Sequence, residues 1–330
     1  MDHLTRDSLR GVWAAVATPF DRKDRFDVEV FQENVRRLAA AGVDGVYTTD
    51  SDGEFYAIEL DEFRSIVDAL AEESQRLGLP TQVGVTWSHT RGVIERLRYA
   101  AERGILGAHV GHPYFMPMTQ ASLAQFWDDV AAAVPEWFGL IHYNTARCPN
   151  YLGAADYRVL ADRIPNLVGV KQTTRDVVEF ADLVETVPEL AHFTGEHALT
   201  PFAASGAVGV YSWFANVNAR YMVEWYQDIV ARRWERCIER QRRMNAFIRE
   251  VAITFGAAGN LHGVIGKALT ASSTFLVPAN STRRPYLAID DAAVAEFRRR
   301  SLVLFADLIL GDGSAPRHGA DANPGDVTGS

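Results

Sequence analysis

Cysteine is scarce in this chain, because its 330 residues include only Cys148 and Cys237, which lie far apart. Two isolated cysteines predict neither a disulfide framework nor a structural zinc site. No apolar run is long enough to cross a bilayer, and the charged N-terminus, MDHLTRDSLRG, lacks the apolar core of a signal peptide. We therefore expect a reducing, cytoplasmic location and no membrane partner.

Positive charge is also limited, since the formal net charge is -9 and no basic stripe is present. This composition argues against nucleic-acid binding, which needs clustered Lys and Arg to neutralise phosphates. Lysine is rarer still: Lys23, Lys171 and Lys267 are the only ones, and all other basic residues are Arg. A Lys that follows the apolar run LVGV, as Lys171 does, suggests a need for an amine that can deprotonate and attack.

The most regular feature of the sequence is an alternation of two kinds of segment. Short apolar runs alternate with longer amphipathic stretches whose apolar residues repeat at three and four positions. Eight strands buried on both faces, each followed by a helix, predict a (β/α)8 TIM barrel. A doubly wound sheet is the alternative, but no G-x-G-x-x-G follows the first run. The eight runs span residues 11–20, 42–49, 80–86, 107–113, 138–144, 166–173, 192–196 and 207–213.

The rhythm stops after residue 216, where only helical patterns follow. We therefore expect a barrel core over 1–217 that carries the catalytic site. Helices over 218–310 are expected to pack on it as part of the same structural unit. The last segment, 311–330, is rich in Gly, Pro, Asp and Ser and is predicted to be disordered.

Barrel active sites lie at the carboxyl ends of the strands, so polar residues that end the apolar runs are candidates. Lys171 would sit in an apolar mouth where desolvation disfavours its ammonium form, leaving an amine able to attack a carbonyl. The simpler interpretation is a Lys that reaches solvent or pairs with a carboxylate. Tyr143 ends the preceding strand and could move protons beside an imine, or could be a packing Tyr. The candidates are Thr18, Ser51 to Glu54, Thr86, His112, Tyr143, Asn144, Lys171 and Glu196.

Several segments carry a family resemblance: AVATPF, DSDGE (50–54), HPYFMP (112–117), IHYN (141–144), GVKQT (169–173) and GVYSWFANV (209–217). In this order they resemble the signatures of the dihydrodipicolinate synthase and N-acetylneuraminate lyase family. The resemblance implies that Lys171 forms an imine with a 2-oxo acid such as pyruvate and that Tyr143 is the general acid and base. It also implies that the loop at 50–54 binds the substrate carboxylate, and that the protein is a homotetramer or homodimer. No cofactor or metal is implied.

Within that loop, Gly53 would let the chain approach an anion closely, and Glu54 completes the motif. The family usually has G-T-T-G-E, whereas here Asp50, Ser51 and Asp52 precede Gly53. Ser51 can still supply a hydroxyl to the proton relay. Asp52 would repel a carboxylate unless it points away or binds a hydroxyl or amine of the acceptor.

Other departures argue against true dihydrodipicolinate synthase activity. The tyrosine pair that the synthases place after the fourth strand is Tyr114 and Phe115 here. The Arg five residues after the strand-five Tyr is replaced by Cys148, with Arg147 one position early.

A different branch of the family fits better. FMPMTQASLAQFWDDVAAAVPEW and STRRPYL (281–287) resemble hydratase-aldolases that split benzylidenepyruvates into an aldehyde and pyruvate. An aromatic or apolar aldehyde would need a flat apolar wall. Candidates for that wall are Phe55, Trp87, Phe115, Trp213 and Phe214.

Three alternatives stay open. A dehydratase of a 2-keto-3-deoxy sugar acid would use the same scaffold with more hydroxyl-binding groups. A metal-dependent barrel hydrolase could use histidines near the strand ends. A catalytically inactive binding protein is also possible on this scaffold. The histidines concerned are His109, His112, His142, His192 and His197, together with Glu196.

Overall fold

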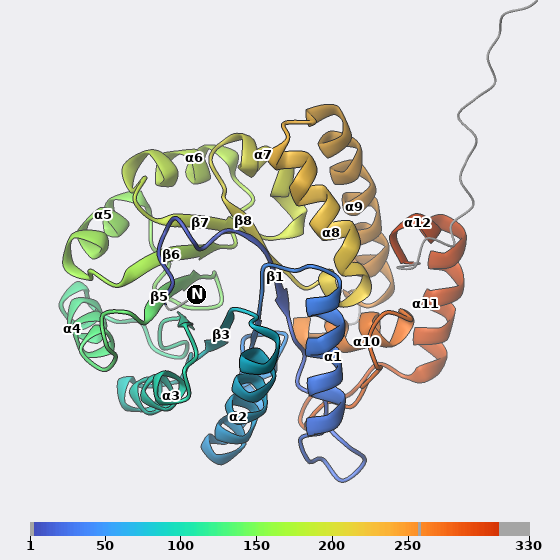
Figure 1. Ribbon diagram of the computed structural model, residues 1–330, viewed down its shortest axis with the longest axis horizontal. Coiled ribbons are helices and arrows are strands. Elements are labelled where there is room, and N and C mark those ends of the chain that lie inside the picture. The colour runs from blue at the N-terminus through green and yellow to red at the C-terminus, as the bar shows by residue number, and fades with distance from the viewer. Residues whose placement is uncertain (1–2, 257–258, 310–330) are drawn as a thin grey trace, which may run out of the picture.

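The computed structural model describes residues 3–256 and 259–309. Eight parallel strands hydrogen-bond in sequence order, and β8 pairs with β1 to close a barrel. All eight predicted strands are confirmed, each shorter than its apolar run, and so is the TIM-barrel fold (Figure 1). The strands are β1 Gly11–Ala15, β2 Gly45–Thr48, β3 Thr81–Gly84, β4 Gly107–Val110, β5 Gly139–Asn144, β6 Leu167–Gln172, β7 Ala191–Thr194 and β8 Gly209–Ser212.

Helices follow the strands and form the outer ring of the barrel (Figure 1). Several begin at side chains that cap their first backbone N–H groups: Asp27 before α1, Thr119 before α4 and Asp176 before α6. The ring comprises α1 Val28–Ala40, η1 Phe55–Ala57, α2 Leu60–Leu77, α3 Thr90–Glu102, α4 Gln120–Ala131, α5 Ala154–Arg163, α6 Val177–Thr186, η2 Glu196–Ala198, α7 Leu199–Ala204 and α8 Ala215–Val230.

Side-chain alternation along the strands divides the core into two clusters. Outward-facing residues such as Val12, Val46 and Val170 pack against the helices in the larger cluster. Inward-facing residues fill the barrel and include Trp13, Tyr47, Ile141, Phe193 and Tyr211. Leu4 and Leu9 of the N-terminal segment belong to this second cluster, so this segment closes the amino-terminal end of the barrel.

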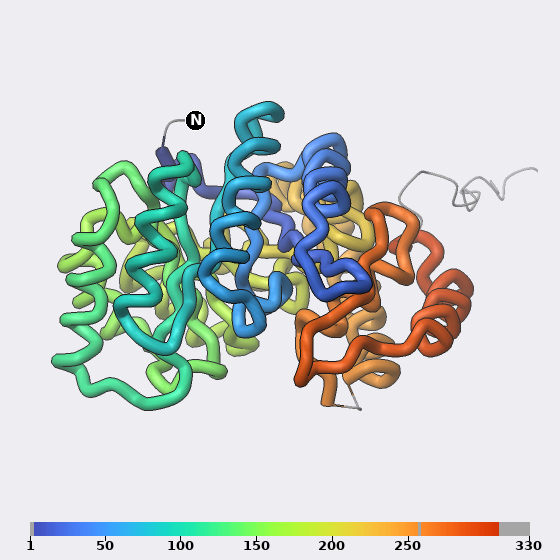
Figure 2. Tube along the Cα trace, turned by 90° about the horizontal axis from the view of Figure 1, so that it is seen from below, coloured from blue at the N-terminus to red at the C-terminus, as the bar shows by residue number. Residues whose placement is uncertain are grey.

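The C-terminal part is helical, as expected, and lies to one side of the barrel next to α8 and α1 (Figures 1 and 2). It contains α9 Trp234–Thr254, α10 His262–Ser272, α11 Asp291–Leu304 and α12 Ala306–Ile309. The expected core boundary at residue 217 falls inside α8, which packs on β1 as the eighth barrel helix. The helical pattern is interrupted between α8 and α9 at Arg232, which has a left-handed φ of 54°. No Gly or Pro in the sequence marks this interruption. The segment 311–330 lies outside the described residues.

In the described part of the chain, no helix is both long enough and apolar enough to span a membrane.

Candidate active site

The two residues singled out from the sequence lie side by side inside the barrel. Tyr143 of β5 and Lys171 of β6 are register partners on adjacent strands. The Nζ atom of Lys171 lies 4.1 Å from the centroid of the Tyr143 ring. The hydroxyls of Tyr143 and Ser51 are 3.3 Å apart, within hydrogen-bonding distance. The structure thus brings together Lys171, Tyr143 and Ser51, as the sequence predicts.

The loop after β2 approaches this cluster through a tight turn. A Cβ atom on Gly53 would lie 2.3 Å from the backbone nitrogen of Thr49, so only glycine fits there. The hydroxyl of Thr18 donates to the carbonyl of Gly53 at 2.9 Å and fixes the turn. Within the described residues, the N–H groups of Ser51, Asp52 and Gly53 donate to no backbone carbonyl.

Lys171 does not lie in an apolar mouth, because Asp50 forms a buried ion pair with it. The carboxylate Oδ2 of Asp50 accepts from Lys171 Nζ at 2.7 Å. Burial lowers the pKa of Lys171, but the attraction of Asp50 outweighs it, so the pKa is raised above the usual value. The expectation of apolar surroundings is therefore wrong, because Lys171 has a buried carboxylate partner that favours its ammonium form.

The carboxylate of Asp50 is also held in its charged form and in a fixed position. Burial opposes the charge of Asp50, but attraction to Lys171 and His109 lowers its pKa to about 2. A Cβ atom on Gly84 would lie 2.3 Å from Asp50 Oδ1, so the absence of a side chain on β3 makes room for the carboxylate. Family loops with Gly at this position have no such group.

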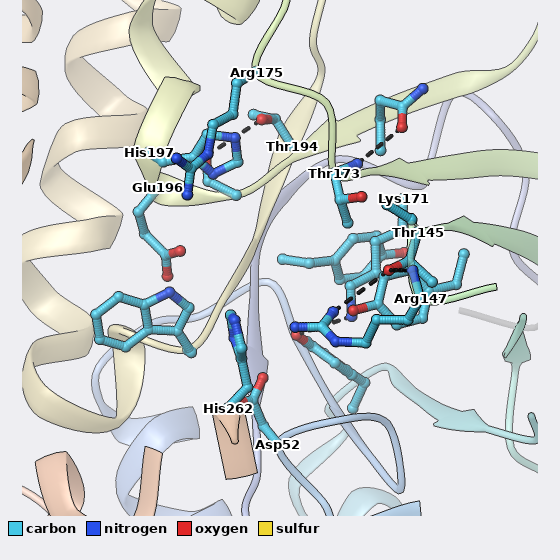
Figure 3. A pocket seen from close by; sticks show the side chains of 17 residues that line it. Asp52, Thr145, Arg147, Lys171, Thr173, Arg175, Thr194, Glu196, His197 and His262 are labelled. Carbon is cyan, nitrogen blue, oxygen red and sulfur yellow. Dashed lines mark hydrogen bonds between the residues drawn. The ribbon is translucent and has the colours of Figure 1, made fainter. Parts of the chain in front are cut away.

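A cavity of about 420 Å³ opens from this cluster at the carboxyl ends of the strands. Most of the residues that line it have polar or charged side chains. Figure 3 shows Arg175, Glu196 and His197 on one side, Lys171, Thr145 and Arg147 on another, and Asp52 and His262 projecting from below. The volume suits a small-molecule ligand.

Glu196 is the buried acid of this cavity. Its Oε1 accepts from the Ser212 hydroxyl at 2.6 Å and from the Phe214 N–H at 2.9 Å. Burial raises the pKa of Glu196 to about 7 in spite of these bonds. Glu196 can therefore give or take a proton near neutral pH.

The predicted substrate-binding residues divide into two groups. Asp52 and Trp213 line the cavity. The other side chains do not. Glu54 forms a buried ion pair with Lys267 of α10, and Asn144 is bonded to both backbone groups of Leu152. Both hold the scaffold around the site.

Phe115 is 79% exposed and does not line the cavity. Of the five aromatic residues expected to form a flat wall, only Trp213 reaches the cavity. Phe214 is buried in the outer core, and Trp87 stacks beneath the guanidinium of Arg96 at 3.6 Å.

The histidines considered for metal binding contact other groups, although the ring centroids of His112 and His142 lie 4.3 Å apart. His112 accepts from Trp127 Nε1, His192 contacts the carbonyl of Val187, and His197 contacts the carbonyl of Thr174. Across residues 3–256 and 259–309, no three His, Cys, Asp or Glu side chains gather as metal ligands would.

Sequence reasoning missed four contributors to the site. Asp50 was assigned only to a loop, although its place two residues after β2 puts it at a strand end. Arg175 follows Lys171 by four residues, as Arg147 follows Tyr143, and both line the cavity. His262 comes from α10, outside the barrel, and no pattern in the sequence points to it.

The geometry agrees with comparisons to known proteins. The sequence matches the dihydrodipicolinate synthetase family over residues 8–300. It is 27% identical over 260 residues to an uncharacterised DapA-like lyase of Thermococcus kodakarensis, covering 76% of this chain and 87% of that protein. It is 29% identical over 218 residues to the 4-hydroxy-tetrahydrodipicolinate synthase of Natronomonas pharaonis, covering 65% and 73%.

Among solved structures, the crystal structure of YagE, a prophage protein of the dihydrodipicolinic acid synthase family from E. coli K12 in complex with pyruvate, has a TM-score of 0.82 to this chain. The two sequences are 21% identical, and the matched region covers 90% of this chain and 98% of YagE.

The barrel, its cavity at the strand ends and the neighbouring Lys171 and Tyr143 agree with this match, and the proteins of the matched family are lyases. The chain belongs to the dihydrodipicolinate synthetase family, as its motifs indicated.

Proposed function

We propose that this protein is a Schiff-base-forming lyase that breaks or forms a carbon–carbon bond next to a 2-oxo acid such as pyruvate. The observation that carries the proposal is that Lys171 and Tyr143 line one cavity side by side, with the Ser51 hydroxyl within hydrogen-bonding distance of the Tyr143 hydroxyl. Lys171 attacks the 2-oxo carbon, the hydroxyl leaves as water, and the resulting iminium accepts the electrons of the adjacent bond.

Tyr143 is suited to carry protons in these steps. Its hydroxyl, paired with that of Ser51, can protonate the carbonyl oxygen that Lys171 attacks and take up the proton of the alcohol that is cleaved. The N–H groups of the loop at 51–53 would hold the substrate carboxylate. Asp52 faces the cavity from the same loop, close to His262, where it can bind a hydroxyl of the substrate.

The far part of the cavity favours a polar partner aldehyde. Arg147 and Arg175 line it, and no carboxylate of the described chain lies within ion-pairing distance of either guanidinium. Thr145, His197 and Glu196 add hydroxyl-binding groups. We infer a substrate with hydroxyls and a second anionic group, such as a 2-keto-3-deoxy aldaric acid. Its aldol cleavage or its dehydration would both use the same imine.

A second candidate is the hydratase-aldolase with an aromatic aldehyde. A neighbouring chamber shares Trp213 and His262 with the cavity and is lined by Ile248, Val251 and Leu269. This apolar surface between the barrel and the C-terminal helices could accept an aromatic ring.

The two candidates are separated by kinetics on three substrates. These are a 2-keto-3-deoxy aldaric acid, the corresponding acid without the distal carboxylate, and a benzylidenepyruvate. We expect the highest kcat/KM for the first. Arg175→Gln should lower that value roughly tenfold, the worth of one charge-assisted hydrogen bond at an accessible site, and leave imine formation with pyruvate unchanged.

Arg91→Gln, at an exposed arginine of α3, serves as the control. Turnover of benzylidenepyruvate alone would support the second candidate, and no product from any of the three would contradict the proposed function.

A further inference from the structure

Asp50 is the hydrogen-bonding group nearest to Nζ of Lys171, the reacting nitrogen. The mechanism that the family resemblance implies assigns no role to Asp50. The ammonium of Lys171 must lose a proton before it can attack, because a protonated amine has no free electron pair. Its neighbours in reach are Asp50 Oδ2 at 2.7 Å and the hydroxyl of Tyr47 at 3.4 Å. The Tyr47 hydroxyl carries its own proton, since burial raises its pKa well above the usual value. Asp50 alone can accept.

The same oxygen of Asp50 also contacts a second base. Oδ2 lies 2.5 Å from His109 Nδ1, and His109 Nε2 lies 2.7 Å from Gln82 Oε1. Tyr211 donates its hydroxyl proton to that amide oxygen at 2.9 Å. A separation of 2.5 Å between Asp50 Oδ2 and His109 Nδ1 is that of a short hydrogen bond with one proton between the two atoms, so His109 holds the carboxylate in place.

We propose that Asp50 is a catalytic residue that takes the proton that Lys171 gives up, and that His109 is the residue that positions it. An Nζ–H bond breaks, its electron pair stays on nitrogen, and an O–H bond forms on the Asp50 carboxylate. This step rests on the proposed imine chemistry.

Proton transfer to Asp50 keeps the nitrogen of Lys171 paired with an opposite charge before and after imine formation. When the carbinolamine loses its hydroxyl as water, a proton leaves with it and Asp50 becomes a carboxylate again. That carboxylate then faces the iminium at the place where it faced the ammonium. A buried site therefore never holds an unpaired positive nitrogen.

Other ionisable groups surround Asp50 without replacing it. Tyr47, Tyr143 and Tyr211 face it from β2, β5 and β8, and Asp52 lies farther along its own loop. Among these, burial raises the pKa of Tyr47 and that of Tyr211 well above the usual value, so both hold their protons. Asp52 lines the cavity without a hydrogen bond to Lys171 in the described structure.

The test measures the rate of imine formation with pyruvate from pH 6 to 9, by quenching with borohydride and weighing the intact protein. In the wild type the rate should not change with pH, because the acceptor is built in. Asp50→Asn, which keeps the shape but cannot accept, should be slower by roughly 10²- to 10⁴-fold at pH 7. Its rate should also rise about tenfold per pH unit, since hydroxide must then remove the proton.

Controls keep the outcomes separate. Asp61→Asn removes a carboxylate from an exposed position of α2 and should match the wild type. An Asp50→Asn variant that forms the imine as fast as the wild type would overturn the inference. A variant that is slow at every pH, with no rise in rate as the pH increases, would also overturn it, because that result indicates a merely structural role for Asp50. If the variant does not fold, a wild-type rate that climbs tenfold per pH unit would overturn it as well.

His109→Gln should lower the wild-type plateau and keep it flat, and an unchanged plateau would contradict the positioning role of His109. A wild type that forms no adduct at all would overturn the proposed function, and this inference with it.

Discussion

The buried ion pair between Glu54 and Lys267 links the substrate loop to the C-terminal helices. Both residues are at most 1% exposed, and Lys267 Nζ also donates to the carbonyl of Ser281 at 2.7 Å. Lys267→Met would leave the carboxylate of Glu54 buried without its counter-charge. Breaking a buried pair from one side costs about 3–5 kcal/mol. We therefore expect a marked loss of stability at a position that contributes no atom to the cavity.

The thermal midpoint gives the assay. Unfolding entropy is about 2.1 cal/mol/K per residue, so this loss lowers the midpoint by roughly 5–8 °C in scanning calorimetry. Glu54→Leu combined with Lys267→Met removes both charges and should recover most of the loss, because an apolar pair of similar volume is often neutral. Arg299→Met, which breaks an exposed pair with Glu296, should shift the midpoint by about 1 °C or less.

The design also tests whether the barrel and its C-terminal helices unfold together, as the sequence suggests. A single transition that moves as a whole in Lys267→Met would support one structural unit. An unchanged midpoint, or a double variant whose loss equals the sum of the two single losses, would refute the reasoning.

Three further outcomes follow from the same contacts. Lys171→Ala should abolish turnover. Tyr143→Phe should leave imine formation detectable but slower by roughly 10²- to 10⁴-fold. Borohydride trapping with pyruvate measures imine formation in both variants. His112 is neutral in the fold because its Nε2 accepts from Trp127 and its Nδ1 donates to Asn150, and burial lowers its pKa from 6.5 to about 4. The unfolded chain therefore binds more protons between these values, and stability falls as the pH drops through this window, by about 3 kcal/mol for this group. His112→Gln should flatten the pH dependence of the midpoint between 7 and 4, and an unchanged slope would contradict this.

The fold was predictable because its signal is local and repeated. Each strand of the barrel is an apolar run bounded by polar residues, and Tyr143 and Lys171 could be paired from their places on consecutive strands. The boundary of the last barrel helix was not predictable, because the left-handed Arg232 breaks a continuous helical pattern with no Gly or Pro to mark it.

The site was predictable only in part, since its chemistry depends on contacts between distant segments. Nothing in the run DSDGE says that Asp50 reaches Lys171, 121 residues away, while Glu54 turns to Lys267. Aromatic residues were overestimated as wall residues for the same reason. Their number was visible in the sequence, but whether each pointed to the core, to solvent or to the cavity depended on loop geometry.

The most direct test of the central claim is intact-protein mass spectrometry after incubation with pyruvate and borohydride, followed by peptide mapping. The chain has only three lysines, so the position of an adduct is unambiguous. Our account predicts one reduced adduct per chain, on Lys171. An adduct on Lys23 or Lys267 instead, or no adduct with pyruvate or other 2-oxo acids, would contradict it.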